Sequence, residues 1–343
     1  MITITEGEAQ HATQVSGWHL MPAIPDEIGF AGAFAGLSHG KLIVAGGANF
    51  PDGGAPWTGA VKRWTNKVFI LDRPDGKWHL ADPLPDSLGY GGSISYNNQL
   101  IFIGGSNEHG HSATVQAMEW KDGTVSNRKF PDLPTPIANT TAVLLDNFIY
   151  VAGGIRTADA RQAEHNFWRL NLQQTEKGWE VLENWPGAPR MLSVMGVHDS
   201  KIYLVSGVEL INGERHYLHD GFCYQPGKGW KKIADLPVAV AAAPSPALTL
   251  PQGLLIAGGD DGKLASQAAV LKDKHPGFSN RMLMYNPALN VWTDGGSIAA
   301  CPVTTTAVDW NGLYVIPGGE IRPAVRTNGI LVRLPSCEGG EMP

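Results

Sequence analysis

A short segment near the end of the chain holds the residues best suited to acid–base chemistry. In GGEIRPAVRTNG, residues 318–329, Glu320 directly follows two glycines and Arg326 stands six residues further on, with Arg322 between them. A carboxylate held beside a guanidinium can accept and return a proton while the cation orients an anionic substrate. A surface salt bridge would show the same spacing, so the pattern by itself leaves both interpretations open.

Half of the twelve arginines fall in a few variable loops. The net charge of the chain is −6. Arginines gathered in an otherwise acidic protein favour a small anionic ligand, because a guanidinium makes bidentate contacts with a carboxylate. Solvated loops also carry arginines, so for any single residue a plain surface role stays open. The six are Arg63, Arg156, Arg161, Arg215, Arg322 and Arg326.

These loops occupy the same place in six copies of one repeat. Each copy contains small residues, an apolar strand, a turn, a second apolar strand and a closing glycine pair, after which the variable loop begins. Kelch repeats, which each form one blade of a β-propeller, have a period of about 50 residues. Equivalent loops of radially arranged blades project from one face, so their side chains can meet in a shared pocket. The last glycines, 49 to 60 residues apart, are Gly47, Gly105, Gly154, Gly207, Gly259 and Gly319.

The two ends of the chain predict how the ring closes. The sixth copy stops after its third strand, GILVRL (329–334), whereas the chain begins with an unpaired fourth-strand segment, GWHLMPAIP (17–25). Pairing the two completes six four-stranded blades and removes an open sheet edge. We therefore expect an all-β, six-bladed kelch-type propeller over residues 16–334, with an N-terminal extension over 1–15 and a C-terminal tail over 335–343.

A tryptophan recurs in the fourth strand of most copies. The second copy differs, since its tryptophan, Trp120, ends the third strand instead. Large aromatic side chains at equivalent places of a repeat are typical of packing between blades, and we prefer this interpretation to sugar-stacking platforms. The fourth-strand tryptophans are Trp78, Trp179, Trp230 and Trp292.

Composition argues against several classes of protein. The acidic balance disfavours a general nucleic-acid binder, and no apolar run approaches the ~18 residues of a membrane span. No basic segment followed by an apolar core opens the chain, so we expect a cytoplasmic protein, or a periplasmic one if an export signal has been removed. The cysteines, Cys223, Cys301 and Cys337, are few and far apart, which predicts reduced thiols.

Two blocks of the sequence resemble one enzyme family. Gly319, Glu320, Pro323, Arg326 and Thr327 match the Gly-Glu…Pro-x-x-Arg-Thr segment of the sialic-acid mutarotases (N-acetylneuraminate epimerases), which are kelch propellers. The block GFAGAFAGLSHGKLIVAGGANF resembles a late blade of those enzymes but stands near the N-terminus here. In this order of its blades, the chain resembles the cyclically permuted branch of the mutarotases.

The resemblance implies an isomerase that interconverts the α and β anomers of N-acetylneuraminic acid, or of another keto-acid sugar, by acid/base-assisted ring opening. It implies that Glu320 is the base and that Arg326 holds the substrate carboxylate, with no metal or other cofactor. The sequence leaves the oligomeric state open. Further candidates for substrate binding in the equivalent loops are Arg322, Arg156, Asn49 and Asn107.

Two functions other than an isomerase are also known for propellers of this kind. A non-catalytic kelch module that binds protein or carbohydrate would expose an apolar or aromatic loop patch, for which Phe50, Trp57 and Trp64 are candidates. A sialidase, also a six-bladed propeller, should carry Asp-box repeats (Ser-x-Asp-x-Gly-x-x-Trp), and the sequence has none. The interaction module is therefore the main alternative to the isomerase.

Metal chemistry receives little support from the sequence. A copper radical oxidase needs a Cys–Tyr pair with histidine ligands, but Cys223-Tyr224 falls at an expected strand turn. His109 and His111 share one loop, and two histidines in a loop are usually solvated. We expect no metal site.

Overall fold

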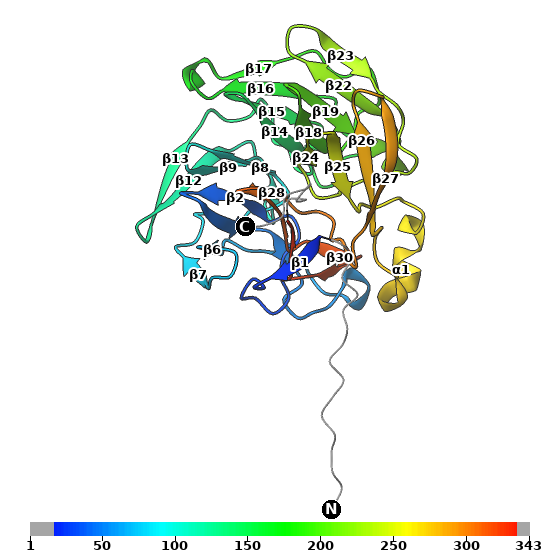
Figure 1. The fold of residues 1–343 in the computed structure, drawn as a ribbon. Helices are drawn as coiled ribbons and strands as arrows, with labels where there is room; N and C mark the ends of the chain where they lie inside the picture. The colour runs from blue at the N-terminus through cyan, green and yellow to red at the C-terminus, as the bar shows by residue number, and fades with distance from the viewer. Residues whose placement is uncertain (1–16, 335–343) are drawn as a thin grey trace, which may run out of the picture.

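The protein is an all-β ring of six sheets around a central axis. The structure, a computed structural model, describes residues 17–334; the expected extension over 1–15, the tail over 335–343 and Cys337 lie outside the described residues. Each of the six sheets has four antiparallel strands, and Figure 1 shows them arranged as blades. The predicted six-bladed β-propeller is confirmed.

The blades follow one another along the chain. In each, the strand given first lies nearest the axis. Blade 1 contains β2 (Phe34–Ser38), β3 (Lys41–Ala45), β6 (Val68–Leu71) and β7 (Trp78–Ala81). Blade 2 contains β8 (Gly92–Tyr96), β9 (Gln99–Ile103), β12 (Val115–Lys121) and β13 (Thr124–Lys129). Blade 3 contains β14 (Thr141–Leu145), β15 (Phe148–Ala152), β16 (Phe167–Asn171) and β17 (Trp179–Val181). Blade 4 contains β18 (Val194–His198), β19 (Lys201–Val205), β22 (Gly221–Gln225) and β23 (Gly229–Lys232). Blade 5 contains β24 (Leu248–Leu250), β25 (Gly253–Ala257), β26 (Arg281–Asn286) and β27 (Val291–Ser297).

Blade 6 is built from both ends of the chain, as the sequence predicts. Its strands are β28 (Val308–Trp310), β29 (Leu313–Pro317), β32 (Ile330–Arg333) and β1 (Trp18–Met21). The antiparallel register joins Trp18 to Arg333 and Met21 to Ile330. The first strand of the chain thereby occupies the outer place of the last sheet, and the ring is closed by backbone hydrogen bonds.

Short elements follow the second strand of five of the six blades, on one face of the ring. Four blades carry a two-stranded hairpin there, blade 5 carries a short helical segment, and blade 3 carries a 3-10 turn later, between its outer strands. The hairpins are β4 (Ala48–Asn49) with β5 (Arg63–Trp64), β10 (Ser106–Asn107) with β11 (Gly110–His111), β20 (Val208–Ile211) with β21 (Glu214–Tyr217), and β30 (Glu320–Arg322) with β31 (Val325–Arg326). The helical turns are η1 (Pro56–Thr58), η2 (Thr175–Lys177), η3 (Ala265–Gln267), α1 (Ala268–Leu271) and η4 (Lys272–Lys274).

The hydrophobic core lies between the blades. The second strands, such as β3 with its sequence KLIVA, are buried on both faces because a neighbouring blade covers each side. Six clusters of buried apolar side chains each join two neighbouring blades, one for every junction of the ring. Blade packing therefore explains why these strands read as continuous apolar runs.

The recurring tryptophans tie four of the six blades to the blade before. Trp78 in β7 donates its indole N–H to the carbonyl of Pro22, at 2.9 Å, across the junction where the ring closes. The other three donate in the same way to the segment that leaves the preceding blade, at 2.8 to 2.9 Å. Their predicted role in blade packing is confirmed. The remaining pairs are Trp179 with Pro131, Trp230 with Glu183, and Trp292 with Ala234.

A ring of six backbone hydrogen bonds surrounds the axis. The residue that lies two to six places before each inner strand donates its N–H to the carbonyl of the equivalent residue one blade back, at 2.7 to 2.9 Å, until the circle closes on itself. Every member has a positive φ, which turns its N–H and carbonyl along the circle. This axial ring is formed by Gly32, Tyr90, Asn139, Leu192, Ala242 and Thr304.

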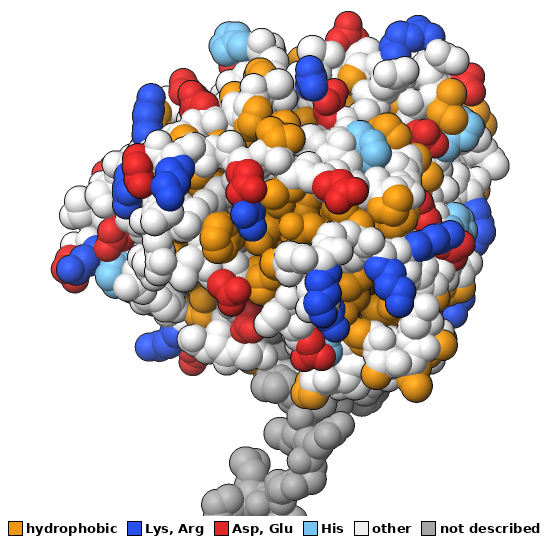
Figure 2. Space-filling view, turned by 90° about the horizontal axis from the view of Figure 1, so that it is seen from above, with side chains coloured by type: hydrophobic (Ala, Val, Ile, Leu, Met, Phe, Trp, Pro, Cys, Tyr) orange, Lys and Arg blue, Asp and Glu red, His pale blue; other side chains and the backbone are white. Residues whose placement is uncertain are grey.

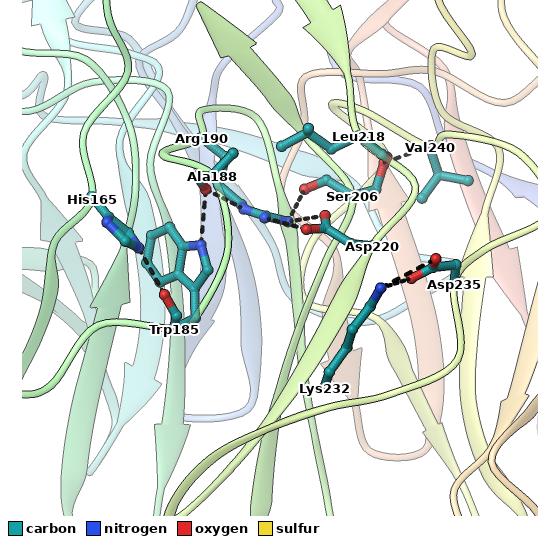
Figure 3. Close-up of polar contacts among 10 residues, drawn as sticks. All are labelled: His165, Trp185, Ala188, Arg190, Ser206, Leu218, Asp220, Lys232, Asp235 and Val240. Atoms are coloured by element: carbon teal, nitrogen blue, oxygen red, sulfur yellow. Dashed lines mark hydrogen bonds and ion pairs between the residues drawn. The ribbon is translucent and has the colours of Figure 1, made fainter.

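A buried ion pair lies between blades 3 and 4. Arg190 is fully buried at a position where the other five copies have Phe30, Leu88, Ile137, Val240 or Pro302. As Figure 3 shows, its guanidinium bonds both carboxylate oxygens of Asp220, at 2.9 and 3.0 Å. It also donates to the carbonyls of Ser206 and Ala188, at 3.1 and 3.2 Å. All three guanidinium nitrogens therefore have an acceptor inside the protein.

The face of the molecule drawn in Figure 2 shows no single dominant charge. In Figure 2, side chains of both signs are interspersed around a group of apolar side chains near the middle of the view. Within residues 17–334, no helix is both long and apolar enough to cross a membrane.

Candidate active site

The loops that follow the second strands enclose one cavity of about 950 Å³. Side chains from all six blades line it, which confirms that the equivalent loops converge on a shared pocket. Five residues of the axial ring, all except Gly32, form its floor. One lining residue from each successive blade is Lys62, His111, Ala160, Tyr217, Asp260 and Glu320.

Glu320 and Arg326 lie side by side in this cavity. They are directly opposite one another in the β30–β31 hairpin, a register that places both side chains on the same face. Arg326 Nη1 lies 3.2 Å from Glu320 Oε1. Gly319, with φ of +104°, directs the chain into this hairpin; a Cβ there would lie 2.8 Å from Pro302 Cβ, so glycine is required. The spacing of the two residues in the sequence is thus explained by a tight hairpin.

The Arg326 side chain is almost fully buried, with 5% of its surface exposed. Its guanidinium carbon lies 4.9 Å from the centre of the Phe50 ring, and Nε donates to the carbonyl of Ala48 at 3.5 Å. Nη1 is buried without an aligned hydrogen bond to any described residue. A buried charge with unsatisfied donors is costly, and such exceptions concentrate at functional sites. The arrangement fits a guanidinium that completes its hydrogen bonds with a ligand.

Glu320 keeps one carboxylate oxygen available. Oε1 accepts the N–H of Ala324 at 2.6 Å and faces Arg326, whereas Oε2 has no hydrogen bond to any described residue. A carboxylate held by one oxygen and open at the other can accept a proton from a ligand without losing its position.

A second carboxylate stands at the equivalent place of blade 5. Asp260 follows its glycine pair just as Glu320 does, and it lines the same cavity. Its Oδ2 accepts the hydroxyl of Tyr217 at 2.7 Å and its Oδ1 accepts the N–H of Gly262 at 3.0 Å. Burial, with a further contribution from Asp260, raises the pKa of Tyr217 to about 12, so this hydroxyl stays protonated. Both oxygens of Asp260 are therefore engaged, which leaves Glu320 as the freer base.

Two residues that sequence reasoning missed stand beside Glu320 and Arg326. Lys62 Nζ lies 4.4 Å from the centre of the Trp64 ring and 4.7 Å from that of Tyr90. Burial, and then the charge of Arg326, lower the pKa of Lys62, while Glu320 opposes the change. Burial raises the pKa of Tyr90; Arg326 acts against this and Glu320 adds to it. Within the cavity, the charges of Lys62, Arg326 and Glu320 thus act on one another and on the phenol of Tyr90.

The other predicted binding residues separate into two groups. Asn107 lines the cavity, where its Oδ1 accepts the N–H of His109 at 2.9 Å. Arg322 instead donates to the carbonyl of Asp273 at 2.6 Å, outside the lining of the cavity.

Arg156 and Asn49 also stand apart from the cavity. Arg156 pairs with Glu164 at 2.8 Å on the surface. Asn49 is buried and donates to the carbonyl of Gly29 at 3.0 Å. Neither lines the cavity, so for these two and Arg322 the structure gives the predicted contact with substrate no support.

The six loop arginines likewise divide. Arg63, Arg215 and Arg326 line the cavity, and the other three do not. His109 and His111 line it as well, but among residues 17–334 no group of three or more potential metal ligands is found.

The sequence of this chain is similar to that of one family of known enzymes. Residues 5–126 match the family model described as N-acetylneuraminate epimerase. The N-acetylneuraminate epimerase of Haemophilus influenzae (strain PittEE) is 37% identical over 117 residues, which are 30% of this chain and 31% of that protein. The one from Yersinia enterocolitica is 26% identical over 228 residues, 59% of this chain and 56% of that protein. The resemblance to the N-acetylneuraminate epimerases is confirmed.

The extent of these matches is partial. The chain spans less than two thirds of the length of the curated N-acetylneuraminate epimerases that it matches. A solved structure entitled "Structure of YjhT" superimposes with a TM-score of 0.67 over 90% of this chain and 95% of that one, at 16% identity. At that identity the likeness supports the propeller fold alone.

Proposed function

We propose that the protein is a mutarotase that interconverts the α and β anomers of N-acetylneuraminic acid. The observation that carries the proposal is the pairing of Glu320 with a buried, incompletely bonded Arg326 inside the cavity that the loops of all six blades enclose. The resemblance to the N-acetylneuraminate epimerases supplies the substrate class.

The reaction requires the sugar ring to open and close. The anomeric carbon of this keto-acid sugar carries a hydroxyl, a carboxylate and the ring oxygen. Opening removes the proton of the anomeric hydroxyl, breaks the bond from the anomeric carbon to the ring oxygen, and places a proton on that oxygen. Rotation of the exposed keto-acid end, followed by closure, then produces the other anomer.

The residues of the cavity match these demands. Oε2 of Glu320 is open to accept the hydroxyl proton, and Arg326 is placed to hold the substrate carboxylate in a bidentate contact. A positioned base contributes roughly 10²–10⁴-fold to a rate, which suits a reaction that already proceeds slowly in water. The cavity of about 950 Å³ lies within the ~300–1,000 Å³ range of small-molecule sites.

Proton NMR of the two anomers tests the proposal. An α-linked sialoside is cleaved by a retaining sialidase to release the α anomer, and the approach to equilibrium is followed at near-neutral pH with protein, with heat-inactivated protein and with buffer alone. We expect only the folded protein to accelerate equilibration. Unchanged equilibration together with saturable binding of the sugar would instead favour a carbohydrate-binding kelch module.

The interaction-module alternative loses one of its supports in the structure. Phe50, one of the aromatic residues that kept it open, is buried beneath Arg326, and Trp64 faces Lys62 in the cavity wall. Neither contributes to an exposed aromatic patch of the kind that marks a protein-binding surface.

A further inference from the structure

Ring opening needs an acid as well as a base, and Glu320 supplies only the base. The ring oxygen must gain a proton as its bond to the anomeric carbon breaks, because an alkoxide is a poor leaving group. The acid must therefore reach the same ligand as Glu320 while standing apart from it. This inference rests on the proposed mutarotase activity and concerns a residue to which neither the sequence motif nor the comparisons assign a role.

Lys62 is placed for this task by its surroundings. It belongs to the loop between η1 and β5, on the wall formed by blade 1, whereas Glu320 stands on blade 6. Its ammonium group lies over the rings of Trp64 and Tyr90, which fix its direction by cation–π contact. Among residues 17–334 the structure shows no hydrogen bond or ion pair to Nζ. Because Lys62 lines the cavity and its ammonium has no acceptor among the described residues, a ligand there can accept one of its protons.

The other proton donors of the cavity are less suitable. Burial raises the pKa of Tyr90, which makes its hydroxyl a weaker acid than an ordinary phenol. The hydroxyl of Tyr217 is donated to Asp260. Burial lowers the pKa of His111, whose Nδ1 already pairs with the carbonyl of Ile155 at 3.0 Å. Tyr90 is thus the weaker acid, Tyr217 is engaged with Asp260, and the lowered pKa of His111 disfavours its protonated form near neutral pH.

We propose that Lys62 is the catalytic acid of the reaction, donating a proton to the ring oxygen while Glu320 removes the proton of the anomeric hydroxyl. On opening, the electron pair of the bond between the anomeric carbon and the ring oxygen passes to that oxygen, which takes a proton from the Lys62 ammonium. The hydroxyl oxygen forms the carbonyl and gives its proton to Glu320. On closing, the neutral amine recovers its proton and Glu320 returns its own. Both residues end as they began, and no other reactant is consumed.

The charges facing Lys62 set how readily it releases that proton. Arg326 on β31 destabilises its ammonium form, Glu320 on β30 stabilises it, and His111 on β11 and Tyr90 face it from blade 2. Together with burial, the balance places the pKa of Lys62 below the usual ~10.4 of a lysine. A shift toward neutrality makes the ammonium a better general acid.

Two substitutions separate proton donation from charge. Lys62→Gln removes both, while Lys62→Arg keeps the charge on a group that holds its proton throughout the accessible pH range. We expect both variants to lose roughly 10²–10⁴-fold in kcat, with KM changed less than about threefold in the arginine variant. A Lys62→Arg enzyme with full kcat, or a loss confined to KM, would overturn the proposal and reduce Lys62 to an anion-binding group.

Chemical restoration gives a readout that a structural role would not produce. A Lys62→Cys variant alkylated with 2-bromoethylamine regains a primary amine. Its side chain differs from that of lysine only in having a sulfur atom in place of one methylene group. We expect alkylation to restore most of the lost kcat. Wild-type protein treated identically controls for Cys223 and the other native cysteines. Complete alkylation without recovery counts against the proposal.

The pH profile provides an independent check. Activity that requires the ammonium form is retained below the pKa of Lys62 and falls as the pH rises through it. We expect this alkaline limb in the wild type and in Lys129→Gln, which removes an exposed lysine of β13, and its absence in Lys62→Gln. An unchanged limb in Lys62→Gln would show that another group is the acid.

The same measurements distinguish failure of this inference from failure of the proposed function. If the wild type accelerates anomer exchange and Lys62→Arg does so equally, the mutarotase stands and the assignment of Lys62 fails. If the wild type gives no acceleration, both fail together.

Discussion

Two buried arginines of this protein each face a carboxylate, but their surroundings differ. Arg190 lies between blades 3 and 4, bonds both oxygens of Asp220 and gives its remaining donors to backbone carbonyls. Arg326 lies in the cavity, has one 3.2 Å contact with Glu320 and keeps a buried nitrogen without an aligned partner. Both side chains are at most 5% exposed, so burial alone does not tell a structural pair from a functional one.

The difference lies in how completely the hydrogen-bonding groups are satisfied. A satisfied buried pair holds its neighbours in place and has nothing left to offer a ligand. In an incompletely bonded pair beside a cavity, the missing hydrogen bonds cost free energy. A ligand that supplies those hydrogen bonds recovers that free energy on binding. Arg190–Asp220 should therefore act on stability and Glu320–Arg326 on activity.

Glu320→Gln is expected to have the largest effect. The amide keeps the size of the side chain but cannot accept the hydroxyl proton, so anomer exchange should slow by roughly 10²–10⁴-fold. The midpoint of urea unfolding should stay close to that of the wild type. Exchange measured by NMR at wild-type speed would remove Glu320 from the mechanism.

Asp220→Ala should produce the opposite pattern. It leaves the Arg190 charge buried without its partner, a change that typically costs about 3–5 kcal/mol of unfolding free energy. Urea denaturation measures this loss, and kcat per folded molecule should be unchanged. A stable but inactive variant would contradict the assignment of Arg190–Asp220 to stability rather than activity.

Arg326→Lys should weaken substrate binding. Lysine keeps the charge but cannot contact Ala48, Glu320 and Phe50 from one planar group. Loss of a charged hydrogen bond, worth about 1.5–3 kcal/mol, corresponds to a rise of roughly 10–100-fold in KM. Steady-state kinetics measure it; an unaltered KM would assign carboxylate binding to another residue.

Arg322→Gln and Arg156→Gln should have the smallest effects. Both arginines make contacts away from the cavity, with Asp273 and Glu164. Because exposed ion pairs contribute about 0–1 kcal/mol, we expect less than a twofold change in kcat/KM. A tenfold rise in KM for either would restore the role in substrate binding that the sequence predicts for it.

The sequence predicts the architecture in detail because the repeat states its pattern six times. Small residues, paired strands and glycines recur at each copy, and the unpaired segments at the two ends identify the closing strand. Glu320 and Arg326 are found because they are close together in one motif and a family resemblance singles them out.

The rest of the site depends on contacts between blades, which no local pattern encodes. Lys62 stands in a variable loop, and only the closing of the ring places it beside Glu320. Two residues did leave a signal in the repeat. Tyr90 is the one aromatic residue of the axial ring, and Arg190 is the one charged residue at a place where other copies are apolar. Asn49, predicted as a binding residue, lies in the same loop as Lys62, but its side chain donates to the backbone carbonyl of Gly29.

The way blade 6 is assembled has a consequence for how the chain acquires its structure. β1 cannot pair until β32 has been made, so Met21 contacts Ile330 only after all the residues between them have been synthesised. Contacts so distant in sequence slow folding, because a long loop must close before they form. Until β1 and β32 pair, the sixth sheet has an unpaired edge strand through which nascent chains can associate. Tethering residues 17–25 directly after residue 334 would make the pairing of β1 with β32 local in the sequence.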